Sequence, residues 1–225
     1  MNPEGLFQTK SGPVIIMGNG PSLADMPDEF LAKYPTFGCN TIHLRRGFKP
    51  SYWAAADRWV LRYVDEILAA FPDIPKFAMI ATNARARRIA KEEGCLVGPG
   101  SMPLSKEQSD QMYMFQRRPN PVCIYPSELT PGHLMKPGIS LMGITHAMIG
   151  IALFMGHDKF YLVGCDNTSS GEHFYPDKLN NYNVESPFWE WAFDTLQESI
   201  RPLEIINLST RGKINCLPWA DWRNL

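Results

Sequence analysis

The sequence predicts an α/β protein in which a mostly parallel sheet carries helices on both faces. Short apolar runs rich in β-branched residues alternate with helical patterns along the 225 residues. This alternation is typical of parallel sheets, because a crossover helix returns the chain to the start of the next strand. A Gly-rich turn also follows the first apolar run directly. A chain of this length can bury a substantial core without disulfides or metals.

The apolar runs are the expected strands. The first, Val14–Met17, consists of apolar residues that are mostly β-branched, which favours a buried strand. The full set in chain order is Val14–Met17, Thr36–Cys39, Tyr52–Ala56, Lys76–Ile80, Val122–Tyr125, Lys159–Val163 and Glu204–Asn207.

Helical patterns lie between several of these strands. Arg58–Phe71 spaces its apolar residues among charges, and Asn83–Glu93 is short with a basic face. Gly143–Met155 is apolar nearly all round, which predicts a helix buried against the sheet. Pro187–Ser199 has its proline at the start, where a helix tolerates it.

Two polar stretches interrupt the alternation, and we expect them to be long loops. They are Gly98–Pro121 and Cys165–Ser186. Loops of this length in a compact domain are usually functional or mobile.

The composition favours a cytoplasmic protein with no membrane span. The net charge is −1, so no bulk field draws the chain to nucleic acid or anionic membranes. The five cysteines are scattered without a CxxC pair, which indicates reduced buried thiols and no zinc site. The N-terminus lacks a signal peptide's pattern, and no apolar run is long enough to cross a bilayer.

The chain nevertheless has local basic spots. We interpret them as a solvated helix face, and the alternative is that they bind a phosphate-rich acceptor such as DNA. Their residues are Arg45, Arg46, Lys49, Arg85, Arg87 and Arg88.

The turn Gly18-Asn19-Gly20-Pro21-Ser22 follows the first strand. In α/β proteins a nucleotide binds where strands end in such turns, because glycines let the backbone approach a phosphate and exposed N–H groups point at it. An ordinary tight turn is the alternative reading of this stretch alone.

A second cluster lies far downstream and supports the nucleotide reading. Ser140, Gly143 and Thr145 open the apolar helix, whose free N–H groups and positive dipole end are expected to face the same crevice. The strand after that helix ends in Gly164-Cys165-Asp166. In a parallel sheet both turns lie at the carboxyl edge, where ligands bind.

These motifs resemble a known superfamily. Ile-Met-Gly-Asn-Gly-Pro-Ser-Leu, Phe-Gly-Cys-Asn at 37–40 and Phe-Tyr-Leu-Val-Gly-Cys-Asp at 160–166 are similar to bacterial sialyltransferases that use CMP-sialic acid. They also resemble the motility-accessory flagellin glycosyltransferases and the 6-hydroxymethylpterin diphosphokinase-like proteins, including phage-encoded members. The resemblance covers roughly residues 13 to 215. It implies one Rossmann-like domain over residues 1–225 that binds a nucleotide or nucleotide-sugar.

The resemblance also implies which residues bind the donor. They follow the strands or open the long helix: Gly18, Asn19, Gly20, Pro21, Ser22, Asn40, Asp57, Ser140, Gly143, Thr145, Gly164 and Tyr175.

His173 and Asp166 are the expected catalytic residues. The sialyltransferase relatives carry a general base His in the loop after Gly-x-Asp, and His173 is the His found there. A neutral imidazole can take a proton from an acceptor hydroxyl, and Tyr175 can hydrogen-bond a leaving phosphate. The alternatives are that His173 only positions its loop or the donor, and that Asp57 and Asp166 cap backbone N–H groups.

The expected function is therefore metal-independent transfer from a nucleotide-sugar, with no cofactor and no metal site. The chain has no Asp-x-Asp pair, which fits a CMP-sugar donor better than a metal-bound diphosphate. One alternative is a Mg-ATP-dependent diphosphokinase acting on a hydroxymethyl substrate, and another is a non-catalytic nucleotide- or glycan-binding module.

The sequence leaves the partners open. The acceptor is a glycan, a protein, a small molecule or a modified nucleobase in DNA. Trp219 and Trp222 are expected to pack on the body or on a second subunit, which leaves a homo-oligomer open.

Overall fold

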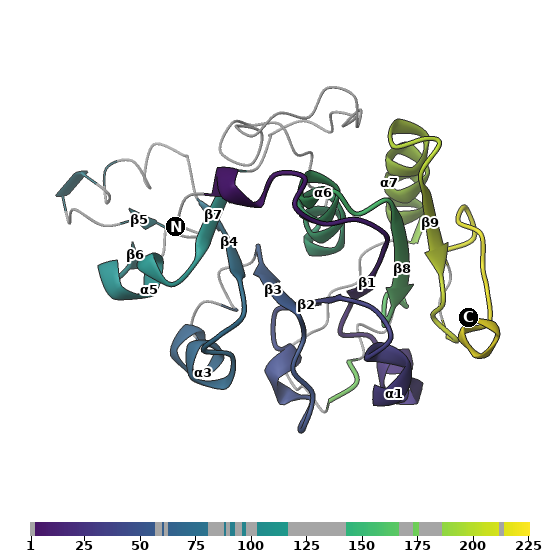
Figure 1. Cartoon of the computed structure of the whole chain (residues 1–225), viewed down its shortest axis with the longest axis horizontal. Coiled ribbons are helices and arrows are strands. Elements are labelled where there is room, and N and C mark those ends of the chain that lie inside the picture. Colours follow the sequence, from purple (N-terminus) through teal and green to yellow (C-terminus); the bar gives the residue numbers. More distant parts are fainter. Residues whose placement is uncertain are drawn as a thin grey trace.

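A computed structural model gives the fold of the chain. The structure describes residues 3–56, 60, 63–80, 88, 91–92, 96–97, 103–116, 143–166, 173–175, 186–211 and 214–225. It contains a seven-stranded sheet in the order β7-β4-β3-β2-β1-β8-β9, with every neighbouring pair parallel. Figure 1 shows this sheet with helices on its two sides. The chain therefore has the α/β fold that the sequence predicts.

The sheet strands are β1 (Pro13–Met17), β2 (Thr36–Cys39), β3 (Tyr52–Ala55), β4 (Lys76–Ile80), β7 (Tyr113–Gln116), β8 (Lys159–Val163) and β9 (Glu204–Asn207). A separate antiparallel pair is formed by β5 (Leu96–Val97) and β6 (Pro103–Leu104).

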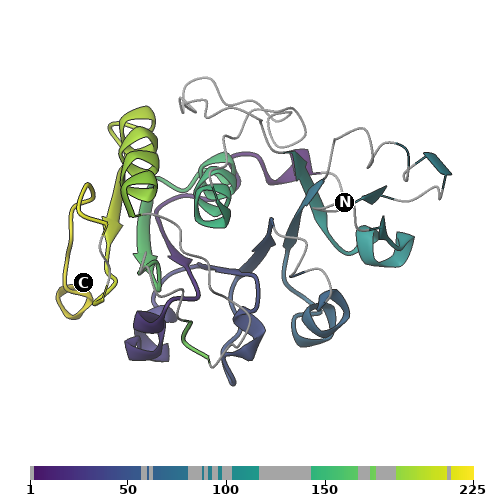
Figure 2. The ribbon, with the colours of Figure 1, turned by 180° about the vertical axis from the view of Figure 1, so that it is seen from behind.

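The strand order reverses between β1 and β8. From β1 the chain adds β2, β3, β4 and β7 on one side, and then returns to add β8 and β9 on the other. The outermost strands, β7 and β9, accordingly lie at opposite ends of the sheet (Figure 2). In open α/β sheets, ligands bind outside the carboxyl ends of the strands at this kind of reversal.

Helices cover both faces. On one face lie α6 (Ile144–Met155) and α7 (Ser186–Ser199), and on the other lie α1 (Asp28–Leu31) and α3 (Val64–Ala70) (Figure 1). The remaining short helices are η1 (Pro3–Leu6), η2 (Pro21–Asp25), η3 (Ile42–Leu44), α5 (Lys106–Asp110) and η7 (Trp222–Asn224).

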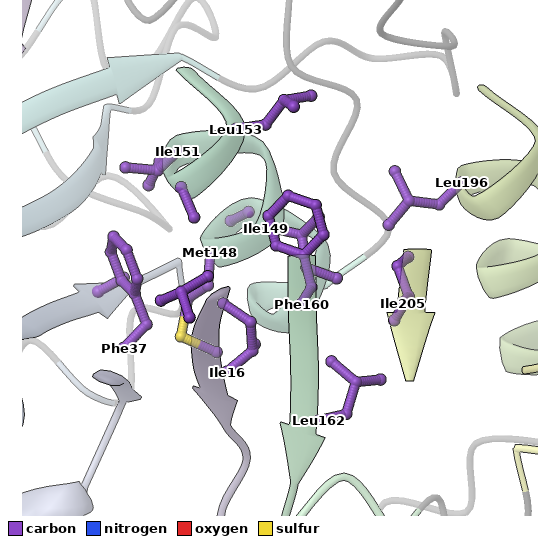
Figure 3. Packing of buried hydrophobic residues seen from close by; sticks show 14 of the residues in the cluster. Ile16, Phe37, Met148, Ile149, Ile151, Leu153, Phe160, Leu162, Leu196 and Ile205 are labelled. Atoms are coloured by element: carbon purple, nitrogen blue, oxygen red, sulfur yellow. The ribbon is translucent and has the colours of Figure 1, made fainter. Parts of the chain in front are cut away.

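The two faces form two hydrophobic clusters because strand side chains alternate. In β8, Phe160 and Leu162 pack toward α6 and α7, whereas Tyr161 and Val163 belong to the cluster with α1 and α3. Figure 3 shows Phe160 beside Ile149 of α6, and Leu162 nearer the carboxyl end of β8. Helix α6 is buried from His146 to Met155, which confirms the helix predicted to be apolar all round.

The expectation that Gly98–Pro121 is a long loop is wrong, because this stretch contains α5 and β7. Ser105 accepts a bond from the backbone N–H of Gln108, and the Gln108 side chain accepts one from the N–H of Ser105, so a capping box starts α5. Tyr113 of β7 stacks on Phe77 of β4, with ring centroids 5.2 Å apart. The aromatic contact draws this stretch into the sheet despite its polar neighbours.

Other expected elements are only partly described. Val122–Tyr125 and most of the helix over 83–93 lie outside the described residues, and α3 accounts for the described end of Arg58–Phe71.

Cys39 and Cys165 are buried and unpaired, as expected, whereas Cys216 is half-buried. Among the described residues, no helix combines the length and apolar character needed to cross a bilayer.

Candidate functional site

The Gly-rich turn and the Gly-x-Asp turn lie side by side at the point of strand reversal. Met17 and Val163 are partners in the register of β1 and β8, and both strands end there. The Gly18 N–H donates to the Val163 carbonyl at 2.8 Å, and the Gly20 N–H donates to the Gly164 carbonyl at 2.7 Å. The structure therefore brings together the two clusters that the sequence analysis placed at one edge.

The glycines are required because the two turns touch each other. A Cβ on Gly18 would lie 2.3 Å from the Gly164 oxygen, and one on Gly20 would lie 2.3 Å from an Asp166 carboxylate oxygen. Gly164 itself has φ of +63°, a conformation that glycine adopts at little cost. Close packing of backbone on backbone explains this motif.

Three backbone N–H groups of the turn donate to acceptors within the protein. Gly18 and Gly20 bond the strand opposite, and the Ser22 N–H donates to Asp166 Oδ2 at 2.7 Å. Pro21 has no N–H. In this conformation these amides bind protein acceptors.

Asp166 is a buried carboxylate at the centre of the site. It is 2% exposed, and burial raises its pKa above the usual 3.8, while the hydrogen bond from the Ser22 backbone N–H and the charge of Arg211 act in the opposite direction. Its Oδ2 caps the turn through Ser22. Its Oδ1 has no hydrogen-bond partner among the described residues. One oxygen therefore has the capping role, and the other remains open to a ligand.

Asn19 and Asn40 follow β1 and β2. The Asn19 Nδ2 group donates to the Cys39 carbonyl at 3.3 Å, which turns its Oδ1 away from that carbonyl. Asn40 has φ of +49°, an uncommon conformation for a residue other than glycine, and one that clusters at functional sites. Its backbone is fixed by a bond from Trp53 Nε1 to its carbonyl at 2.9 Å.

Buried oxygen atoms without a partner gather at the ends of these neighbouring strands. Across the described part of the chain, no partner is found for Asn19 Oδ1, Ser22 Oγ, Asn40 Oδ1 or Asp166 Oδ1. Such atoms are rare in folded proteins because leaving one unbonded costs about 1–3 kcal/mol. The cluster indicates a place where a ligand completes the hydrogen bonding.

The segment His173–Tyr175 docks onto the same turns. The Phe174 N–H donates to the Asn19 carbonyl at 2.9 Å, and the Tyr175 hydroxyl bonds the hydroxyl of Thr41. The His173 ring stacks on Tyr175, with centroids 5.0 Å apart and planes 5° from parallel. The expected base and Tyr175 are thus held beside the Gly-rich turn. Thr41 is a site residue that sequence reasoning missed.

Helix α6 begins at the same edge. Thr145 Oγ1 lies 4.0 Å from Cys165 Sγ, just beyond the end of β8. Gly143 is the N-cap and provides no side-chain bond, and the first turn holds no acidic residue. The first N–H groups of a helix lack partners within it and carry partial positive charge. Two other predicted site residues, Ser140 and Asp57, lie outside the described residues.

Arg45 and Ser209 support the site without having been predicted in that role. Arg45 bonds the Leu23 and Met26 carbonyls and the Asp28 carboxylate, and its side chain is 14% exposed, so the interpretation as a solvated basic face is wrong for Arg45. The Ser209 hydroxyl accepts the Cys165 N–H at 3.1 Å. These contacts join distant segments, and no local sequence signal marks them.

The other described residues of the predicted basic spots differ from Arg45. Arg46 is exposed, as are Lys49, which pairs with Asp73, and Arg88, which pairs with Glu92. They fit the solvated interpretation. Within the described ranges, no group of three or more His, Cys, Asp or Glu residues is arranged to hold a metal ion.

Comparisons with known proteins show the fold. No protein-family model and no curated protein matches the sequence. The structure is similar to that of the MAf glycosyltransferase from Magnetospirillum magneticum AMB-1, with a TM-score of 0.56 and 18% sequence identity. The match covers 97% of this chain but 34% of that protein. At this identity the likeness shows a shared Rossmann-like α/β fold.

Proposed function

We propose that the chain is a glycosyltransferase that moves a sugar from a CMP-linked donor to an acceptor hydroxyl without a metal ion. The observation that carries the proposal is the cluster of buried, unpartnered oxygens at the strand reversal. The fold shared with a glycosyltransferase supports the same activity.

The chemistry of these oxygens selects the nucleoside part of the donor. Amide and carboxylate oxygens accept hydrogen bonds, so Asn19, Asn40 and Asp166 fit groups that donate. Ribose hydroxyls and the amino group of cytosine are such donors. A phosphate is disfavoured beside Asp166 whenever that buried carboxylate is ionised, because like charges repel strongly where water is excluded.

The phosphate fits the start of α6 instead. The Gly143 N-cap leaves the first-turn amides without a side-chain acceptor, and Thr145 adds a hydroxyl at this position. Helix N-termini bind anions through these N–H groups and the helix dipole. The same groups stabilise the negative charge that develops on the leaving nucleotide.

His173 completes the proposed reaction as general base. Its imidazole takes the proton of the acceptor hydroxyl while the acceptor oxygen attacks the anomeric carbon. The bond from that carbon to the phosphate oxygen breaks, and its electron pair leaves with CMP. The stacking of His173 on Tyr175 holds the ring beside the Gly-rich turn.

Nucleotide binding tests the donor. Isothermal titration with CMP, CDP, UMP, UDP, GDP, AMP and ATP, each with Mg²⁺ or with EDTA, is expected to show CMP binding in EDTA. Ser22→Ala should weaken that binding about fivefold to tenfold through the loss of one hydrogen bond. Ser11→Ala is the matched control, because Ser11 is an exposed serine before the other end of β1. If ATP were the only nucleotide of this set to bind, and if its binding required Mg²⁺, the diphosphokinase would be favoured.

Turnover tests the base. His173→Ala should keep CMP affinity while lowering the rate of CMP-sugar hydrolysis or transfer about 10²- to 10⁴-fold. A variant with unchanged turnover would remove His173 from the mechanism. A wild-type chain that binds CMP-sugar but never cleaves it would indicate a binding module.

A further inference from the structure

We propose that Thr41 is a positioning residue that couples donor binding at Asn19 to the placement of His173. The inference rests on the proposed function, because it assigns a role within that site. In this proposal Thr41 contacts neither the acceptor hydroxyl nor the anomeric carbon of the donor. It acts through Asn19 and Tyr175.

Thr41 uses its side chain unusually. It is the N-cap of η3, a position where a threonine hydroxyl normally accepts a backbone N–H of its own helix. Here it makes no such cap bond. Its hydroxyl is directed to residues far along the chain, Asn19 and Tyr175.

These bonds form a continuous chain across the ends of neighbouring strands. Asn19 Nδ2 donates to the Cys39 carbonyl at 3.3 Å and to Thr41 Oγ1 at 3.4 Å. The Thr41 hydroxyl in turn bonds the Tyr175 hydroxyl, and Tyr175 stacks against His173. A second connection runs through the backbone, from the Phe174 N–H to the Asn19 carbonyl at 2.9 Å.

The direction of the Asn19 bonds gives the coupling. Because the amide N–H₂ group is held by Cys39 and Thr41, the Asn19 Oδ1 is the side-chain atom left to bind the nucleotide-sugar. A ligand that bonds Oδ1 restrains the Asn19 amide, and the restrained amide holds the Thr41 hydroxyl. That hydroxyl fixes Tyr175 and, through ring stacking, His173. Hydrogen bonds in such chains polarise and strengthen one another.

The test uses two hydroxyl deletions. Thr41→Val removes the hydroxyl and keeps the side-chain shape, and Tyr175→Phe removes its bonding partner. Thr41→Ser keeps the hydroxyl and serves as the conservative rescue. Thr9→Val is the matched control, since Thr9 is exposed and its hydroxyl bonds the Leu6 carbonyl near the end of α6, away from the strand ends.

The first measurement needs no ligand and no turnover. The His173 imidazole resonances are followed by NMR in the free protein. Thr41→Val and Tyr175→Phe should shift these resonances, and Thr41→Ser and Thr9→Val should leave them in place. His173 signals unchanged in Thr41→Val would overturn the inference even if the protein binds CMP.

The second measurement uses turnover of the CMP-sugar. Thr41→Val should lower kcat about fivefold, with a smaller change in KM, and Thr41→Ser should restore it. The double variant with Tyr175→Phe should lose little more than Thr41→Val alone, because Thr41→Val already removes the bond between the Thr41 and Tyr175 hydroxyls. Additive losses would overturn the coupling. A wild-type chain that does not bind CMP would instead remove the proposed function, and the ligand-free NMR result would still decide the role of Thr41.

Discussion

Single glycines determine how closely the two turns of the site approach. A Cβ on Gly20 would lie 2.3 Å from Asp166 Oδ2 and 2.7 Å from the Gly164 oxygen, so the turns would have to separate. We expect Gly20→Ala to lower the free energy of unfolding by about 1–3 kcal/mol, the usual cost of overpacking. Urea denaturation measures it. Gly5→Ala is the control, because a Cβ there meets nothing within 4 Å. Equal stability of the two variants would contradict the close packing described.

Burial of His146 makes the stability of the protein depend on pH. The ring lies 4.6 Å from that of Phe193, and burial lowers the His146 pKa from 6.5 to about 4, opposed by a weaker backbone hydrogen bond at Ala192. Because the folded pKa is the lower one, the unfolded chain binds the proton more readily. This contribution to stability is present above pH 6.5 and is lost as the pH falls toward about 4.

We expect the wild type to lose up to about 1.4 kcal/mol per pH unit relative to His146→Leu across this window. Urea denaturation at several pH values between pH 4.5 and 7.5 gives both curves. Only the difference in slope is compared, so a general loss of stability in the variant does not affect the result. Parallel curves would mean that His146 titrates alike in the folded and unfolded states.

At the scale of elements, η2 is held by a side chain from the segment after β2. Arg45 bonds the Leu23 and Met26 carbonyls and pairs with Asp28. Removing the guanidinium leaves these carbonyls at the end of η2 without their partner, so Arg45→Met should cost about 1–3 kcal/mol in the free energy of unfolding. Arg46→Met is the matched control, because Arg46 is the exposed neighbour and should change stability by less than about 0.5 kcal/mol.

The Arg45 comparison also has a functional readout. Because η2 begins at Pro21, within the Gly-rich turn, Arg45→Met should weaken CMP binding more than Arg46→Met does. Equal stability and equal affinity in the two variants would show that Arg45 has no supporting role.

The sequence predicts elements well where one local signal is strong. The apolar run of β1 and the continuous apolar pattern of α6 are enough to place both elements. It fails for β7, because Tyr113–Gln116 lies among polar residues and its place in the sheet depends on β4, including the contact of Tyr113 with Phe77. That contact is not visible in a local pattern.

At the scale of the molecule, the sequence also predicts where the candidate site lies. Parallel strands bring their carboxyl ends to one edge, so the sequence predicts the Gly-rich turn and the Gly-x-Asp turn at the same edge. The direct pairing of β1 with β8, which makes the two turns neighbours, comes from the structure. The sequence cannot predict that the turn's amides bond the protein, or that Thr41 joins Asn19 to Tyr175. Those contacts link residues 22 to 166 and 41 to 175, and they depend on the finished packing of several strands.

The site depends on the whole sheet because β8 contributes to both cores. Phe160 is fully buried between β8 and α6 (Figure 3), while the next residue, Tyr161, belongs to the opposite cluster. We expect Phe160→Ala to lower the free energy of unfolding by about 3–5 kcal/mol through lost burial and the cavity that remains. Leu44→Ala is the control, because Leu44 is 45% exposed and should change stability by less than about 0.5 kcal/mol.

The shape of the Phe160→Ala transition is as informative as its midpoint. If the two layers share β8 as one cooperative unit, urea should unfold the variant in a single transition with an unchanged m-value. Affinity for CMP, corrected for the folded fraction, should then stay close to that of the wild type, because Phe160 lies within the strand and away from the turns at its end. A second transition, in which the α6 layer melts first and CMP binding is lost with it, would mean that this layer folds separately and holds its part of the site on its own.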